Sequence, residues 1–163
     1  MGNSERKDLL ESFRAGPARL RKAAKGLSDE LLDFRPSADA WTIRENIAHL
    51  CDSEVYGYAR HRKALAEPGA RVDVWDEMKW HESLHYEASD AAAGLALFEG
   101  LRLATAALVE RVAGEDWSGY RIDHPERGLL TLEQVARIFS DHVAFHVDLV
   151  ERNKRLWKEK GGR

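Results

Sequence analysis

The sequence predicts an all-α fold, a four-helix bundle, and three observations support this prediction. Four long stretches carry apolar residues three and four positions apart, which is the spacing of an amphipathic helix. Two of these stretches open with a capping box, in which Thr42 pairs with Glu45 and Thr131 with Gln134. Three of the four prolines fall between the stretches, and no clear alternating run bounded by hairpin turns predicts a strand. Four amphipathic helices in one domain bury their apolar faces against one another as a bundle.

The first expected helix covers residues 4–25, and a proline lies inside it. Pro17 removes a backbone donor, so it should kink or split this helix. A short helical turn is expected over residues 28–34, with Ser28 as its N-cap. The apolar stripe of the first helix consists of Leu9, Leu10, Phe13 and Leu20.

The second helix is expected over residues 42–67, because a Pro-Gly pair follows it, and it would be about 35 Å long. Residues 69–88 are polar and aromatic, and we expect a long connection that contains a helical turn. The third helix is expected over about 89–113 and a loop over 114–128. The fourth helix is expected over about 131–158, beginning at its capping box.

Length, composition and charge narrow the class of protein. The 163 residues fit one domain spanning 1–163. Hydrophobic residues make up 44% and charged residues 33%, a composition typical of a folded globular protein. The net charge of −3, from 25 basic and 28 acidic residues, argues against nucleic-acid binding through bulk electrostatics.

No sequence feature points to a membrane or to secretion. No apolar run approaches the roughly 20 residues that a membrane span needs. The N-terminal residues lead into no uninterrupted apolar stretch of the kind that a secretory signal carries. Cys51 is the single cysteine of the sequence, so an internal disulfide is excluded and a reducing, cytoplasmic location is expected.

Two of the seven histidines lie on the apolar face of the fourth helix. Its core-facing residues are spaced 3, 4, 3, 4 and 3 apart, which is the pattern of a bundle seam. Burying two adjacent imidazoles without partners costs desolvation energy, and a shared metal ion removes that cost. Two ordinary core histidines, each with its own hydrogen bonds, are the alternative. The seam consists of Leu132, Val135, Phe139, His142, His146 and Leu149.

A third histidine on another helix strengthens the metal hypothesis. His142 and His146 are four residues apart, which places their β-carbons about 6 Å apart on one helix face. His49 lies near the apolar stripe of the second helix and could face that pair in a bundle. Three neutral imidazoles bind a divalent ion at about 2.0–2.1 Å and leave positions for water or substrate. Cys51 points to another side of the helix and is expected to be a small buried hydrophobe.

Three short segments carry a resemblance to a known family. They are WTIRENIAHLCDS at 41–53, DHVAFH at 141–146 and the HPE triplet at 124–126, which precedes a Thr-Leu helix start. With these segments the chain resembles the DinB/YfiT-like family of bacterial candidate metalloenzymes, and the likeness extends over residues 5–157. The order of the three histidines is the most specific part of the resemblance.

The resemblance implies a bundle of up-down-down-up topology with a divalent metal ion, often nickel or zinc. Three histidines hold the ion in such proteins, and they fall here on His49, His142 and His146. The resemblance also implies a homodimer and a small-molecule substrate, which in some relatives is a low-molecular-weight bacterial thiol. Some members resemble thiol-dependent transferases and others are called metal-dependent hydrolases.

A second metal-binding pattern competes with this one. The sequence HESLH at 81–85 matches the H-E-x-x-H pattern of zinc peptidases, in which two histidines bind zinc and the glutamate is the general base. The charged neighbours Lys79 and Glu87 do not suit a buried catalytic helix, and no motif supplies a third ligand. We therefore expect a polar loop or short helix over the mouth of the bundle. An intermediate possibility is that His81, Glu82, His85 or Tyr86 lines the pocket.

Other polar residues are candidates to support the site, and none is assigned a catalytic role. Asp52 and Ser53 follow His49 by three and four residues, so either could orient a ligand or relay a proton. A solvated helix face is the alternative for Asp52. Arg60 and Arg62 either bind an anionic group of the substrate or lie on the surface. Surface or loop positions are expected for His61 and His124.

The expected function is that of a metal-dependent enzyme, either a thiol-dependent transferase or a hydrolase. The ion would lower the pKa of a bound water molecule or thiol and so produce a nucleophile at neutral pH. A non-catalytic metal-binding or stress-response protein is the alternative, because no general base is evident beside the histidines. Ligand binding without a metal is a third hypothesis.

Overall fold

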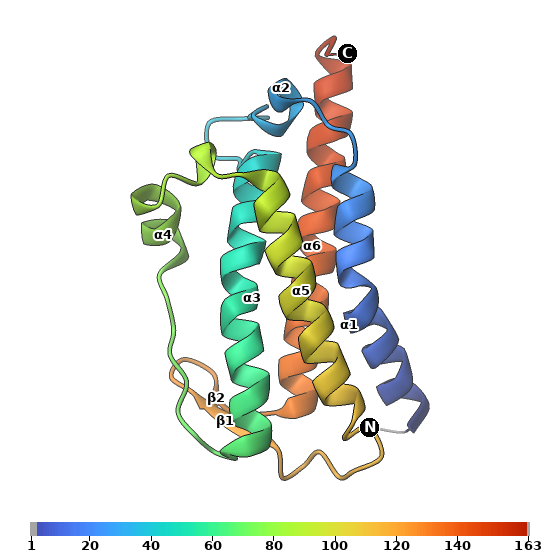
Figure 1. Ribbon diagram of the computed structural model, residues 1–163. Helices are drawn as coiled ribbons and strands as arrows, with labels where there is room; N and C mark the ends of the chain where they lie inside the picture. The colour runs from blue at the N-terminus through green and yellow to red at the C-terminus, as the bar shows by residue number, and fades with distance from the viewer. Residues whose placement is uncertain (1–2, 163) are drawn as a thin grey trace.

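Four long helices make up most of the computed structural model, which describes residues 3–162 (Figure 1). They are α1 (Asn3–Ala24), α3 (Ile43–Ala66), α5 (Ala91–Glu110) and α6 (Leu132–Glu159). In Figure 1, α1 and α6 rise from the bottom to the top, whereas α3 and α5 descend. Each of α1 and α3 packs against both α5 and α6. The predicted all-α bundle and its up-down-down-up order are confirmed.

Both predicted capping boxes are formed and determine where two of the helices begin. Thr42 Oγ1 accepts a hydrogen bond from Glu45 N at 3.1 Å, and Glu45 Oε2 accepts one from Thr42 N at 2.7 Å. Thr131 and Gln134 make the same reciprocal pair, at 3.3 and 2.8 Å. These bonds satisfy amides that have no partner inside the helix. They therefore fix the start of α3 and α6, the two helices that carry the histidines of interest.

The expected split at Pro17 does not occur, since α1 runs unbroken through it. A proline inside a helix costs about 3 kcal/mol. The burial of Phe13 and Leu20 on either side offsets this cost, because both are almost completely buried in the bundle. The expected short turn is α2 (Asp29–Leu32), and Ser28 caps it by accepting a hydrogen bond from Leu31 N.

The connection between α3 and α5 is a long crossover, because both helices run in the same direction (Figure 1). It contains α4 (Glu77–Ser83) and a 3₁₀ turn, η1 (Tyr86–Ala88), both of which contact α3. The predicted helical turn is therefore present as two short segments. They lie along the outer side of α3, where they cover part of the region around the histidines.

The segment before α6 contains a β-hairpin, so the expectation of a bare loop without strands was wrong there. β1 (Arg121–His124) pairs antiparallel with β2 (Gly128–Thr131). Gly128 closes the turn with a φ of 70°, a conformation that glycine adopts without strain. Each strand has four residues, the shortest run that predicts a strand, and the second, Gly-Leu-Leu-Thr, does not alternate between polar and apolar residues.

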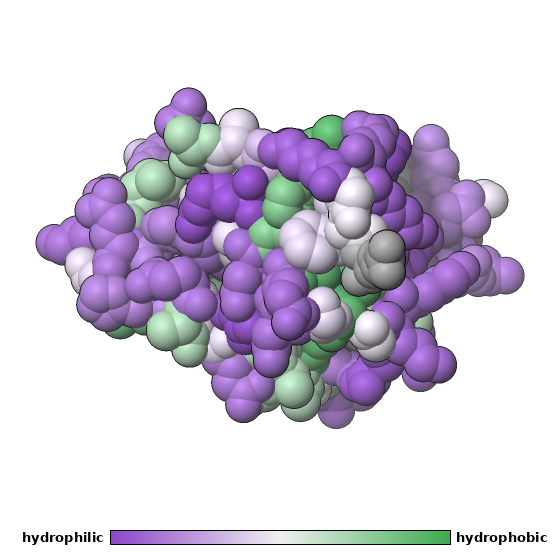
Figure 2. Space-filling model, turned by 90° about the horizontal axis from the view of Figure 1, so that it is seen from above, coloured by the Kyte–Doolittle hydropathy of each residue, from purple (hydrophilic) through white to green (hydrophobic). Residues whose placement is uncertain are grey.

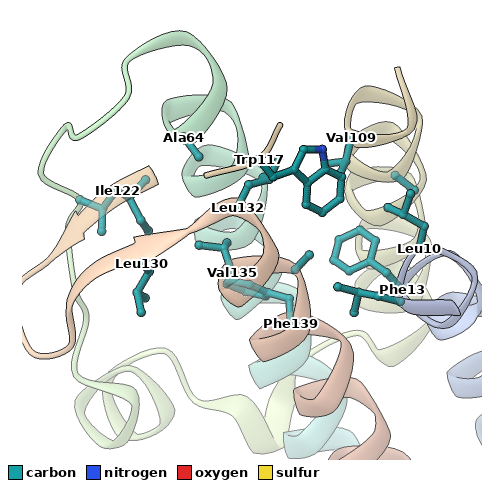
Figure 3. Packing of buried hydrophobic residues seen from close by; sticks show 14 residues of the cluster. Leu10, Phe13, Ala64, Val109, Trp117, Ile122, Leu130, Leu132, Val135 and Phe139 are labelled. Carbon is teal, nitrogen blue, oxygen red and sulfur yellow. The ribbon is translucent and has the colours of Figure 1, made fainter. Parts of the chain in front are cut away.

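The hairpin closes one end of the bundle. Ile122 and Leu130 point inward and pack with Val135 and Phe139 of α6 in one apolar cluster (Figure 3). A second cluster, which includes Leu20, Ile43, Phe98 and Val150, fills the bundle toward the other end. That end, seen from above in Figure 2, is mostly hydrophilic, with apolar side chains visible between the polar ones.

Candidate metal centre

The structure brings the three predicted histidines together between α3 and α6. His142 Nε2 lies 3.0 Å from His49 Nε2 and 3.0 Å from His146 Nε2. The ligand atoms of all three rings lie within 4.8 Å of one another. His49 and His146 are buried, and His142 is half-buried. The cluster is therefore set into the bundle, with His142 on its more open side.

Asn46 determines which nitrogen of His146 carries the proton. Its Nδ2 donates to Thr42 O at 2.7 Å, so Oδ1 is the amide atom that lies 2.7 Å from His146 Nδ1. Because an amide oxygen only accepts, Nδ1 of His146 is the donor and Nε2 keeps its lone pair. Ser53 Oγ lies 3.4 Å from Nδ1 of His142, the corresponding outer nitrogen of that ring. Two outer nitrogens thus contact the protein, while the Nε2 atoms face one another.

Burial keeps all three imidazoles neutral at pH 7. Loss of solvent lowers the pKa of His49 to about 3, of His142 to about 4 and of His146 to about 2. Nearby positive charge lowers these pKa values further, from His142 and His81 for His49, from His142 and His49 for His146, and from Arg102 and Arg127 for His142. A neutral imidazole has one nitrogen lone pair, which is the form that binds a metal ion.

A divalent cation fits this set of donors. Two nitrogen ligands about 2.1 Å from one ion stand about 3.0 Å apart when the angle between them is near 90°. Nε2 of His142 has this separation from both of its neighbours. A proton on that nitrogen could be donated to only one of them, so hydrogen bonding alone leaves one close contact unsatisfied. A shared cation satisfies the lone pairs together.

Two tryptophan rings pack against His49 and form part of the wall of the site. The ring centroids of Trp41 and Trp75 lie 5.0 and 5.4 Å from the centroid of His49. Trp41 also stacks on His81 with the ring planes parallel and the centroids 5.1 Å apart. Trp75 comes from the crossover, so the crossover contributes directly to the wall of the site.

Of the two candidate supporting residues, Ser53 contacts a histidine and Asp52 is engaged elsewhere. Asp52 Oδ2 accepts a hydrogen bond from the Tyr86 hydroxyl at 2.6 Å. That bond ties η1 to α3 and leaves Asp52 without a direct contact to the three histidines among the contacts of residues 3–162. Its contribution is therefore to the position of the crossover.

The HESLH segment does not form a zinc peptidase site. α4 ends at Ser83, and His85 adopts a left-handed conformation with a φ of 53°, so His81 and His85 do not share a helix face. His81 Nε2 lies 3.1 Å from Glu45 Oε1, whereas His85 is exposed and its Nδ1 lies 3.1 Å from Glu87 Oε1. As expected, the segment is a short helix and turn, and its His81 packs beside the site.

Two histidines expected at the surface are buried, which corrects the prediction. His61 is fully buried between the rings of Phe13 and Phe139, and its Nδ1 donates to Gly57 O at 2.6 Å. It follows His49 by twelve residues, which places it about 120° around α3 from His49, where it faces the core between α1 and α6. His124 is 6% exposed, because the alternation of β1 turns it inward with Ile122.

Cys51 is buried, as expected for a small hydrophobe. Burial is the main cause that raises the pKa of its thiol to about 11, and the carboxylates of Asp52 and Glu54 add to the effect. The thiol is therefore protonated at neutral pH, which suits neither metal binding nor nucleophilic attack.

Two cavities adjoin the histidines. One of about 280 Å³ extends from His49 and His142 along the groove between α3 and α6 to the hairpin. The other, of about 390 Å³, adjoins the opposite side of the cluster and includes Trp41 and Arg152 in its lining. Glu77, at the start of α4, lines both cavities. The site is thus accessible to a small molecule from two sides, with one carboxylate common to both.

The sequence reasoning missed Asn46, Trp75 and Glu77. Asn46 precedes His49 by three residues, so helical spacing was a signal for placing it on the same side of α3. Its contact with His146, however, depends on how α3 packs against α6. Trp75 and Glu77 belong to the crossover, which has no periodic pattern from which their positions could be inferred.

Comparisons with known proteins show the family of this chain and agree with its fold. The sequence model of the DinB superfamily matches residues 12–150. The chain belongs to the DinB superfamily. Among its relatives in this superfamily is YfiT of Bacillus subtilis, which is 27% identical over 158 residues that cover 94% of this chain and 88% of YfiT. A Bacillus licheniformis protein is 29% identical over 147 residues, with coverages of 90% and 83%. Both are named as candidate metal-dependent hydrolases.

The solved structure of Bacillus subtilis YfiT has the same fold as this DinB superfamily member. The two superpose with a TM-score of 0.87 at 23% sequence identity, over 100% of this chain and 91% of the YfiT chain. The YfiT structure is described as having an unusual four-helix bundle topology. The predicted family and fold are therefore both confirmed.

Proposed function

We propose that this DinB superfamily member is a metal-dependent hydrolase whose divalent ion is held by His49, His142 and His146. One observation carries the proposal: three neutral imidazoles converge through their Nε2 atoms, with separations of 3.0 Å, at the end of a cavity. The names of the relatives from Bacillus subtilis and Bacillus licheniformis support the same class of reaction.

The residues around the ligands orient them and form part of the wall of the site. A divalent ion, when bound, is a Lewis acid that lowers the pKa of a water molecule toward neutrality. Asn46 holds the His146 ring in the tautomer that directs a lone pair inward, and Ser53 is placed to do the same for His142. The Trp41 and Trp75 rings pack against His49 as part of that wall.

Glu77 is our candidate for the general base. It is the carboxylate that lines both cavities next to His49 and His142. In a hydrolysis it would accept a proton as the water oxygen bonds to the electrophilic atom, and then return that proton to the leaving group. The Glu77→Gln variant should retain bound metal and lose hydrolysis, because an amide cannot accept that proton.

Elemental analysis of the purified protein tests the metal site. We expect about one equivalent of metal in the wild type, none in His142→Ala and about one in the control His81→Ala. Equal metal content in the wild type and His142→Ala would refute the site. Loss of metal from His81→Ala alone would indicate that the HESLH segment binds the metal instead. Three imidazole ligands suit either nickel or zinc, and the same measurement identifies which of them is bound.

A thiol-dependent transferase and a non-catalytic metal-binding or stress-response protein are the alternatives. A transferase should show a metal–sulfur absorption band when a low-molecular-weight bacterial thiol is added to the cobalt-substituted protein. A hydrolase should release product from ester or amide substrates with no thiol present. Inactivity of the metal-loaded protein in both assays would favour the non-catalytic alternative.

The predicted homodimer is retained as a proposal, with the outer face of α5 as its interface. Eight exposed residues of this helix between Ala92 and Ala107 are uncharged, including Leu97 at 52% and Leu103 at 40% exposure. By length and composition alone α5 could also cross a membrane, but it carries Arg102 buried inside the bundle. The same apolar face on two copies can pair about a two-fold axis. Light scattering should give a dimer mass for the wild type and a monomer mass for Leu97→Glu.

The cytoplasmic location, which was expected from the single cysteine, also stays a prediction.

A further inference from the structure

The cavity beside the histidines has two arginines at its opposite end. Arg60 of α3 and Arg127 of the hairpin turn both line it, together with His124 and Glu126. Arg60 follows His49 by eleven residues, which is about 16 Å along the helix axis. A single cavity of about 280 Å³ therefore connects the candidate metal centre to a cationic end.

The positive charge of Arg60 is only partly compensated. Its Nη2 donates to Asp73 O at 2.7 Å, while its Nε is buried and has no hydrogen-bond partner in the described part of the chain. Burial and the charge of Arg127 both lower the pKa of Arg60. Within residues 3–162, no carboxylate lies at ion-pair distance from either guanidinium. Both groups therefore retain donors for a ligand.

His124 supplies a further donor at the same end. Its Nδ1 accepts a hydrogen bond from Glu126 N at 3.3 Å. Burial and the two arginines lower its pKa, so the ring is neutral at pH 7. In a neutral imidazole whose Nδ1 accepts, Nε2 carries the proton and donates. The cationic end thus presents two guanidinium groups and one N–H group.

Charge and shape define the ligand that this cavity would take. Of the residues that line this end of the cavity, Arg60 and Arg127 carry two positive charges and Glu126 one negative charge, so the lining carries one net positive charge. The Asp73 carboxylate also acts on Arg60 but does not line the cavity. A carboxylate balances the net charge of the lining, whereas a phosphate group of charge about −1.5 to −2 exceeds it. Between the two ends the wall is apolar and consists of Ile122, Leu130, Val135, Ile138 and Phe139.

We infer that Arg60, Arg127 and His124 bind the carboxylate of an elongated, otherwise apolar substrate whose reactive group lies at the three histidines. The inference rests on the proposed function for the reaction, but the carboxylate site itself needs no metal. Arg62 is not part of this site, since its guanidinium lies over the Tyr58 ring and donates to Tyr58 O.

Hexanoate and its neutral analogue hexanamide test the carboxylate site. Each is titrated into the protein as purified, and again after metal removal with a chelator, by calorimetry and by the NMR signal of the Trp75 indole N–H. We expect hexanoate to bind at least tenfold more tightly than hexanamide in both preparations. Hydrogen bonds to charged groups have the strength that this ratio requires.

Matched variants locate the binding. Arg60→Gln and Arg127→Gln should each weaken hexanoate binding at least tenfold, while Arg62→Gln removes the same charge from the same helix and should leave it unchanged. Arg127 is exposed, and among the described residues its side chain makes no hydrogen bond or ion pair, so Arg127→Gln should fold. This variant therefore tests the site even if Arg60→Gln fails to fold. Equal binding of hexanamide, or an equal loss in Arg62→Gln, would overturn the inference.

Two further measurements distinguish the carboxylate site from a phosphate site and from the proposed metal site. Tighter binding of hexyl phosphate than of hexanoate would overturn the assignment of a carboxylate in favour of a phosphate. The Arg60→Gln and Arg127→Gln variants should retain one equivalent of metal. Lack of hexanoate selectivity in the wild type, with one equivalent of metal bound, would refute only the carboxylate site. Absence of metal from the wild type, with hexanoate selectivity intact, would refute only the metal site.

Discussion

Two buried polar clusters lie close together on α3, and they differ in how completely their atoms are paired. The first is the ion pair of Glu54 with Arg102 of α5, in which Arg102 Nε and Nη2 donate to the two carboxylate oxygens at 2.8 and 2.6 Å. Arg102 also donates to Phe139 O at 3.0 Å and to Phe13 O at 3.4 Å. Its guanidinium lies over the Phe13 ring, 4.1 Å from the centroid. This cluster is complete without any ligand.

The histidine cluster includes His49, five residues before Glu54 on α3, and not all of its buried polar atoms have hydrogen-bond partners. His146 Nδ1 has a full partner in Asn46, and His142 Nδ1 has a long contact with Ser53, but His49 Nδ1 is buried with no partner among the described residues. The three Nε2 atoms face one another without enough protons to pair them. The comparison teaches that a paired buried charge ties helices together, whereas converging unpaired nitrogens leave lone pairs that a bound cation would satisfy.

Removing one partner of the complete cluster should have the largest effect on stability. Arg102→Met leaves Glu54 buried without its counter-charge, which should lower the free energy of unfolding by about 3–5 kcal/mol. Urea unfolding followed by circular dichroism measures this. The double variant Glu54→Leu/Arg102→Met should recover most of the loss, because no unpaired charge remains. A loss below about 1 kcal/mol in the single variant would contradict a structural role for the pair.

A metal ion should complete the second cluster and stabilise the fold. Zinc or nickel at a free concentration 100 times its Kd should raise the free energy of unfolding of the wild type by about 2.7 kcal/mol. His142→Ala should show no such increase, because a ligand is missing. Thermal unfolding with and without metal provides the measurement. An equal increase in both proteins would place the bound metal elsewhere.

The sequence predicted the helices and the histidine cluster because both depend on helical periodicity. Spacings of three and four residues placed His142 and His146 on one face, and the capping boxes fixed where α3 and α6 begin. Their meeting with His49 follows once these two helices pack side by side. Whether the three rings bind a metal is a separate question, which the elemental analysis above addresses.

The remaining parts of the site depend on packing that no local pattern encodes. Asn46 reaches His146 only in the observed register between α3 and α6. Glu77 and Arg127 lie in a crossover and a tight turn, and the second of the four-residue strands that position the turn does not alternate between polar and apolar residues. His61 was expected at the surface or in a loop by default, yet it is buried between two phenylalanine rings.

Replacing Asn46 sharpens the comparison, since its Oδ1 accepts the short hydrogen bond from Nδ1 of His146. Asn46→Leu removes the acceptor for His146 Nδ1, and loss of such a supporting contact weakens metal affinity about 10- to 100-fold. Competition with a chromogenic chelator measures the affinity. Asn153→Leu is the matched control, because Asn153 is equally buried but donates to Trp41 O. A similar loss in both variants would indicate general destabilisation.

His61 tests how a single buried, unpaired imidazole nitrogen affects the pH dependence of stability. Its Nε2 is buried without a partner in the described structure, but no second imidazole converges on it. Burial lowers its pKa from 6.5 to about 4, so the unfolded state binds the proton first as the pH falls. Stability is therefore complete above pH 6.5 and is lost progressively between pH 6.5 and 4, with a slope of up to about 1.4 kcal/mol per pH unit.

Urea unfolding of the metal-free wild type and His61→Leu at several pH values isolates this proton. The three site histidines contribute equally to both proteins, so the difference in slope belongs to His61. Identical slopes would mean that the folded protein already binds a proton at His61. His61→Leu should also keep its bound metal, because a lone unpaired nitrogen is not a site for a cation.

Ser53→Ala should have the smallest effect of these substitutions. Its hydroxyl oxygen lies 3.4 Å from His142 Nδ1, which is long for a hydrogen bond, whereas Asn46 approaches His146 to 2.7 Å. Metal affinity should therefore fall less than tenfold in Ser53→Ala and more than tenfold in Asn46→Leu, when both are measured by the same chelator competition. Equal losses would mean that the Ser53 contact shortens when the ion binds, so that the distances in the metal-free cluster do not rank its supporting residues.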